Sequence, residues 1–222
     1  MNKPKVLLLH NTLAHYRLPI WNLLAQKCDL TVTFSFGKTI DTSKYDFKVI
    51  YLPTYKIWKF ILQKINIRKF ARQYDLVIAY GADLKWLKFN MLPLFNKQKV
   101  IFWSLGVSAS YTRHFDDYKK YDLIKKFIYN QADALIFYTD YPIHKYEKMG
   151  ISTNKMFVAP NTVEVYPLKE KKTKDTILFI GTLYQQKGIQ FLLDSYLKLK
   201  EKYLLPILKI IGEGPEFENI SK

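Results

Sequence analysis

The sequence predicts an α/β protein whose parallel sheet is covered by helices on both faces. Three observations support this fold class. Short apolar runs typical of buried strands recur along the chain, and amphipathic stretches typical of helices lie between most of them. Hydrophobic residues make up 49% of the 222 residues, which is enough for a packed core. No apolar run reaches the roughly eighteen residues that a membrane-spanning helix needs.

The predicted elements follow one another in regular alternation. We expect strands at residues 6–10, 30–36, 47–52, 76–80, 100–103 and 134–138. We expect helices at residues 18–27, 57–73, 84–95, 118–131 and 142–149. Residues 159–175 contain two prolines and a run of charge without apolar periodicity, which indicates a linker. The expected domains are therefore 1–165, and a linker with a second domain over 166–222.

The segment over residues 176–220 carries the strongest functional signal. A buried strand ends at Gly181, and the pair Lys187–Gly188 comes directly before an amphipathic helix. Free backbone N–H groups and the helix dipole favour an anion at such a helix start, and a Lys adds a full positive charge. The pattern predicts a phosphate site. The alternative is a solvated Lys beside an ordinary turn.

This segment resembles the donor half of family 4 glycosyltransferases of the GT-B fold. The matching elements are GTLYQQKG after one strand and GEGPEFENI after the next. The resemblance implies that Gly181, Lys187 and Gly188 border a sugar-nucleotide diphosphate. It places Gly212, Glu213 and Gly214 near the nucleotide. Thr182 stands where the family usually has Arg, so a second cation on the diphosphate is not expected.

The amino-terminal half resembles the acceptor domain of the same enzymes. The matches are HYRLPIWNLLA, WSLG, and QADALIFYTDYPIHKYEKMGI followed by PNTVE. Ligands of open parallel sheets bind beyond the carboxyl ends of the strands. Strand ends and resemblance together give the acceptor-cleft candidates Asn11, Tyr16, Arg17, Gly81, Ser104, Gly106, Thr139 and Asn161; His10 and Gly37 also follow strands. The first strand-to-helix turn lacks glycine, which argues against NAD or FAD.

No residue is assigned as catalytic from the sequence. His114 and Asp83 are weak candidates, and the alternatives are a surface histidine and a helix cap. Asp116 and Asp117 are adjacent and do not form the spaced acidic pair of metal-dependent glycosyltransferases. We therefore expect neither a metal nor a cofactor. The family's Glu pair eight residues apart is also absent, so we expect a truncated donor domain and little or no transfer activity from this chain.

A stretch at residues 55–72 is basic and aromatic and contains no acidic residue. Read as a helix, it would turn Trp58, Lys59, Lys64 and Arg68 toward an anionic membrane. A core-packed helix with a solvated outer face is an equal alternative. The formal charge of +16 favours an anionic partner but does not identify it.

The sequence thus predicts a GT-B-like protein with two Rossmann-like domains. The expected activity is retaining, hexosyltransferase-like transfer from a nucleotide-sugar donor into surface or capsular polysaccharide. The acceptor would be a lipid-linked glycan at the inner face of the cell membrane, reached from the cytoplasm. The alternative is a non-catalytic basic module for an anionic membrane or nucleic acid, although no nucleic-acid motif is present. An epimerase or phosphorylase would share the architecture but not the Lys-Gly spacing.

Overall fold

The computed structural model describes residues 3–37, 41–81, 83–95, 97–108, 115–116, 119–163, 165–167 and 175–221. The chain divides into two compact units. The first comprises residues 1–108 and 118–165, and the second comprises residues 109–117 and 166–222.

The first unit is built on a seven-stranded sheet that is parallel throughout. Its strands, in spatial order, are β3 (Lys48–Tyr51), β2 (Asp29–Phe34), β1 (Lys5–Leu9), β6 (Leu76–Ala79), β7 (Lys99–Ser104), β8 (Ala134–Phe137) and β9 (Met156–Val158). Strand β9 was not among the predicted strands. The strand order reverses between β1 and β6, the place where open sheets of this kind bind ligands.

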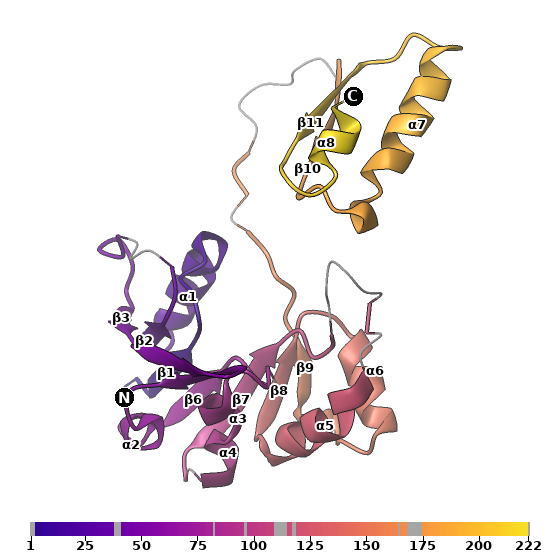
Figure 1. Cartoon of the computed structure of the whole chain (residues 1–222). Coiled ribbons are helices and arrows are strands. Elements are labelled where there is room, and N and C mark those ends of the chain that lie inside the picture. The colour runs from indigo at the N-terminus through magenta and orange to yellow at the C-terminus, as the bar shows by residue number, and fades with distance from the viewer. Residues whose placement is uncertain are drawn as a thin grey trace. The chain divides into compact units, whose positions relative to one another are not determined.

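Helices cover both faces of this sheet, as the sequence predicts (Figure 1). Leu7 and Leu9 of β1 share a core with residues from α2 (Ile67–Ala71), α3 (Leu87–Asn90), α4 (Leu92–Phe95), α5 (Asp122–Gln131) and α6 (Tyr141–Lys148). Val6 and Leu8 point to the opposite face, where α1 (Leu18–Ala25) packs. Short 3₁₀ turns lie at η1 (His15–Arg17), η2 (Lys119–Tyr121) and η3 (Thr153–Lys155).

The predicted helix over residues 57–73 is wrong. Its first part forms an antiparallel hairpin of β4 (Thr54–Ile57) and β5 (Phe60–Gln63), and only Ile67–Ala71 is helical. Aromatic and β-branched residues favour strands. Here Ile57 pairs with Phe60 across the hairpin, and Tyr55 pairs with Leu62. The Asn66 side chain accepts a hydrogen bond from the Lys69 amide at 3.0 Å, which starts the helix at that point.

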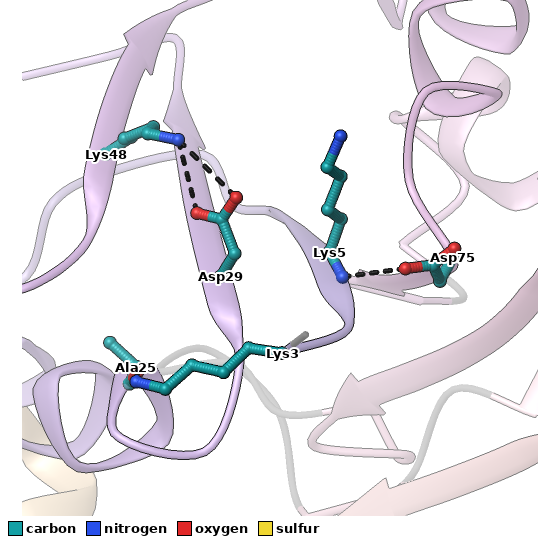
Figure 2. Close-up of polar contacts among 6 residues, drawn as sticks. All are labelled: Lys3, Lys5, Ala25, Asp29, Lys48 and Asp75. Carbon is teal, nitrogen blue, oxygen red and sulfur yellow. Dashed lines mark hydrogen bonds and ion pairs between the residues drawn. The ribbon is translucent and has the colours of Figure 1, made fainter. Parts of the chain in front are cut away.

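Polar contacts hold the sheet together at the end where its strands begin (Figure 2). The backbone amide of Lys5 donates to the carboxylate of Asp75 at 2.8 Å. Lys48 Nζ lies 3.2 Å from the Asp29 carboxylate, and Lys3 Nζ donates to the Ala25 carbonyl at 3.2 Å. These contacts tie β1, β2, β3 and β6 together at the end opposite to the strand ends that carry the candidate ligand residues.

The second unit contains one parallel strand pair, β10 (Thr176–Ile180) and β11 (Ile207–Ile211), among its described residues. The turn η4 (Gln185–Lys187) leads into α7 (Ile189–Lys200), and α8 (Phe217–Ile220) follows β11. Leu183 and Ile189 are buried, whereas many other apolar side chains of the unit are exposed. In neither unit do the described ranges include a helix with the length and apolar content to span a membrane.

Candidate functional site

Two glycine turns pack against each other at the carboxyl ends of β10 and β11. The Gly181 amide donates to the Ile211 carbonyl at 3.0 Å, and the Leu183 amide donates to the Glu213 carbonyl at 2.8 Å. A Cβ on Gly212 would lie 1.8 Å from the Gly181 carbonyl oxygen, and one on Gly214 would lie 2.6 Å from the Leu183 carbonyl oxygen. These positions therefore require glycine, because any side chain would separate the two turns.

Lys187 and Gly188 lie immediately before α7, as the sequence predicts. Gly188 has a φ of 66° and is the N-cap residue of the helix. Among the described residues, no side chain caps the amino end of α7. The first N–H groups of a helix have no partner within the helix and favour an anion. Lys187 and Thr182 are both exposed. The structure thus brings five of the predicted donor residues together in the two turns: Gly181, Thr182, Gly212, Glu213 and Gly214. Lys187 and Gly188 follow four and five residues after the buried Leu183.

In the first unit, Arg17 is a buried cation at the strand-end edge of the sheet. Its guanidinium donates to the Tyr138 hydroxyl and lies over the rings of Tyr16, Trp103 and Tyr138 at 5.2 to 5.7 Å. Burial opposes the charge, but hydrogen bonds to Tyr138 and Tyr16 outweigh it and raise the pKa of Arg17. Nε of Arg17 is buried without a hydrogen-bond partner among the described residues.

His10, which directly follows β1, lies close to Arg17. Burial and then the charge of Arg17 lower the pKa of His10 to about 4, while the hydrogen bond with the Thr12 carbonyl acts in the opposite direction. Nδ1 lies 2.8 Å from that carbonyl oxygen and 3.3 Å from the Thr12 amide nitrogen. Nε2 has no partner within the described part of the chain. His10, Arg17, Trp21, Tyr80 and Trp103 all line one small pocket.

Three of the predicted cleft residues serve packing. Ser104 is buried and shares a 2.8 Å hydrogen bond with the Tyr129 hydroxyl, whose pKa is raised by burial. Gly106 has a φ of 79°, and its carbonyl accepts from Tyr146 at 2.7 Å. A Cβ on Gly81 would lie 2.2 Å from the Phe102 ring. The structure therefore places these residues toward the core and leaves Arg17, Tyr16 and His10 at the edge.

The other predicted residues are dispersed. The Asn11 carbonyl accepts from the amides of Ser35 and Phe36 and joins the first two strand ends. Thr139 and Asn161 are exposed. The Asp83 carboxylate accepts from the Lys85 amide at 3.1 Å, which is a local turn rather than a cap on α3. His114 lies outside the described residues. Sequence reasoning missed Tyr80 and Tyr138, although they are the last residues of the predicted strands 76–80 and 134–138 and directly follow β6 and β8 in the structure.

The four predicted membrane-facing residues lie on the hairpin and α2 instead of on one helix. Trp58 sits in the hairpin turn with a φ of 51° and is 74% exposed, and Lys59 Nζ lies 4.7 Å from its ring centroid. Lys64 follows β5, and Arg68 belongs to α2. A pocket of about 520 Å³ includes Trp58 and Lys59, and another of about 400 Å³ includes Lys64 and Arg68.

Comparison with known proteins gives relatives but not a family. No protein-family model matches the sequence. The chain is 28% identical over 182 residues to an uncharacterized glycosyltransferase of Methanocaldococcus jannaschii, and the match covers 71% of this chain and 45% of the relative. The chain thus spans less than half the length of this curated relative.

Solved structures share the fold at low identity. HepE from Anabaena, in complex with UDP and glucose, matches with a TM-score of 0.64 at 12% identity over 98% of this chain and 64% of its own. The UDP-N-acetylglucosamine 2-epimerase of Rickettsia bellii matches with a TM-score of 0.54 at 14% identity, with the same two coverages. The expected GT-B-like fold is confirmed. The chain is similar in sequence to one glycosyltransferase and in fold to HepE and to an epimerase.

Proposed function

We propose that this chain binds a nucleotide-sugar donor and takes part in glycosyl transfer. The observation that carries the proposal is the pair of glycine turns, packed backbone to backbone, with Lys187 at the uncapped amino end of α7. The named glycosyltransferase relative supports it, as does the UDP-glucose complex of HepE, a protein of similar fold. We further propose family 4 membership, retention of anomeric configuration and a role in surface or capsular polysaccharide synthesis.

The chemistry would rest on electrostatics. Cleavage of the bond between sugar and diphosphate builds negative charge on the leaving phosphate. The Lys187 ammonium and the first N–H groups of α7 would stabilise that charge, because fixed donors act more strongly where charge develops. In the first unit, the cation of Arg17 and the neutral ring of His10 would help hold the acceptor. No residue is assigned the step of proton transfer.

A thermal-shift panel tests the donor proposal. UDP-, GDP- and CMP-sugars are added separately to the wild type and to Lys187→Ala, with Lys202→Ala as a matched exposed control. We expect at least one nucleotide sugar to raise the melting temperature of the wild type and of the control but not of Lys187→Ala. If no nucleotide sugar stabilises the wild type, or if only nucleic acid does so in a strongly salt-dependent way, the proposal fails.

A second candidate role is docking to an anionic membrane that presents a lipid-linked glycan acceptor. The exposed Trp58 at the hairpin tip, flanked by Lys56 and Lys59, favours it. Aromatic side chains sit well at the membrane interface, and each nearby cation adds about 1 kcal/mol on an anionic surface. Co-sedimentation with neutral and anionic vesicles tests this role. Equal binding to both, or no loss on Trp58→Ala with Lys59→Gln, would remove its support.

A further inference from the structure

A pocket of about 400 Å³ lies between α2 and the helix pair α3–α4. Its lining combines cations and apolar side chains: Lys64, Ile65, Ile67, Arg68, Lys88, Met91, Leu92 and Phe95, together with Asn66. Neither glycine turn of the second unit contributes to it, and it shares no lining residue with the small His10 pocket. It is therefore a separate candidate site.

Among the described residues, three cations and no carboxylate line this pocket. Lys88 Nζ is held there by the backbone carbonyls of Gln63 and Ile65, at 2.6 and 3.3 Å. The Arg68 guanidinium lies 5.4 Å from the centroid of the Phe95 ring. Like charges without a counter-ion repel one another, so an anion between them would relieve that repulsion. The positive charge of the lining therefore favours an anionic ligand.

The apolar part of the pocket narrows the choice of anion. Ile67 and Leu92 are buried and form its floor, whereas Met91 and Phe95 remain exposed beside the cations. A free phosphate would leave these apolar walls in water. A phosphate attached to a hydrocarbon chain would cover them, and burial of apolar surface would add to its affinity. The ligand that fits both the cationic part and the apolar part of the pocket is an anionic amphiphile.

We propose that this pocket binds the phosphate headgroup of an anionic membrane phospholipid, with the start of one acyl chain against Met91 and Phe95. Lys64, Arg68 and Lys88 hold the phosphate. The inference rests on the proposed membrane role and deepens it by adding a defined lipid site beside the Trp58 hairpin. It is independent of donor binding at Lys187.

The direct test is binding of a soluble short-chain lipid. Dihexanoyl-phosphatidylglycerol, kept below its micelle concentration, is titrated into the intact chain, with dihexanoyl-phosphatidylcholine and inorganic phosphate as separate arms. We expect the anionic lipid to bind and the other two to bind at least about tenfold more weakly. Lys64→Gln with Arg68→Gln should weaken binding about thirtyfold, since two cations are lost. Lys27→Gln with Lys148→Gln, which removes two exposed charges elsewhere, should leave binding unchanged.

A filling variant separates a pocket from a merely basic surface. Met91→Trp occupies the apolar part and keeps every charge, so we expect it to abolish binding of the short-chain lipid. Retained binding, or equal binding of inorganic phosphate, overturns the proposal. Vesicle binding that survives Met91→Trp but is lost with Trp58→Ala also overturns it, while leaving the membrane role intact. The nucleotide-sugar panel on the same variants reports on donor binding separately.

Discussion

The guanidinium of Arg17 donates a hydrogen bond to the hydroxyl of Tyr138, which is 121 residues further along the chain. The contact joins the first strand-to-helix turn to the end of β8 and fixes a buried positive charge at the carboxyl edge of the sheet. Buried charges are tolerated when hydrogen bonds and nearby π-systems compensate for lost hydration. Tyr138 is therefore a structural partner of Arg17 as well as a residue of the candidate acceptor edge.

Removing that partner should be costly. Tyr138→Phe keeps the ring but removes one of the two tyrosine hydroxyls that accept hydrogen bonds from the buried Arg17 guanidinium, so we expect a loss of about 1–3 kcal/mol in the free energy of unfolding. Urea denaturation measures it, with Tyr51→Phe, whose side chain is exposed, as the control. If the two variants are equally stable, the hydrogen bond does not hold the cation.

The low pKa of His10 predicts a pH-dependent stability. The unfolded histidine takes up a proton near pH 6.5, but the folded one does so only near pH 4. Below pH 6.5 the unfolded state therefore binds more protons, and stability falls as pH falls. The accumulated loss by pH 4 is on the order of 3 kcal/mol.

Denaturation between pH 7 and pH 4 compares the wild type with His10→Phe, which cannot be protonated. The wild type should lose more stability across this window than the variant. Arg17, whose charge acts on His10 in the wild type, is present in both proteins, so its own ionisation does not explain a difference. Parallel pH profiles would show that His10 is not held neutral by the fold.

The Gly212 position predicts a packing defect in the second unit. In Gly212→Ala the new Cβ would overlap the Gly181 carbonyl oxygen, so we expect about 2–4 kcal/mol of destabilisation and faster hydrogen exchange in β10 and β11. Gly181→Ala is a matched control for folding, because its Cβ would make only ordinary contact with Phe179 at 3.7 Å. Equal exchange in the two variants would mean that the turns are not tightly packed.

The ion pair of Lys145 with Asp122 spans 2.8 Å, and each side chain is only 12% exposed. Lys145→Met should cost about 3–5 kcal/mol, because a buried carboxylate loses its counter-charge. Lys99→Met should cost at most about 1 kcal/mol, since the pair of Lys99 with Asp133 is exposed. Thermal or urea unfolding compares the two directly. Similar losses would contradict the burial argument.

Local patterns predicted the fold well and the hairpin badly. Alternating apolar runs gave the parallel sheet, because buried strands and amphipathic helices have distinct periods. The spacing of Trp58, Ile61, Leu62 and Ile65 fits one face of a helix. In the structure, Ile61 and Leu62 pair across the hairpin, Trp58 lies in its turn and Ile65 follows it. In so short a segment, contacts with the rest of the fold decide the secondary structure more than the local pattern does. Here the Ile61 amide donates a 2.7 Å hydrogen bond to the Lys85 carbonyl.

The candidate site was predictable only in part. Glycine turns and a Lys before a helix are local signals, so the second-unit cluster could be named from the sequence. The partnership of Arg17 with Tyr138 depends on a contact between distant segments, which no local pattern reveals. Likewise, a position at a strand end does not show whether the Ser104 side chain faces a ligand or the core. Its hydrogen bond with the buried Tyr129 hydroxyl shows that it faces the core.

In the proposed function, Lys187 and the first N–H groups of α7 hold the diphosphate of a nucleotide sugar. Isothermal titration of UDP-glucose into the wild type, Lys187→Met and the control Lys202→Met tests it most directly, with uridine as a ligand that lacks the diphosphate. We expect UDP-glucose to bind the wild type and the control, and Lys187→Met to bind about tenfold or more weakly, since a charged hydrogen bond is lost. Equal affinity in Lys187→Met, or uridine binding as tightly as UDP-glucose, would contradict the claim.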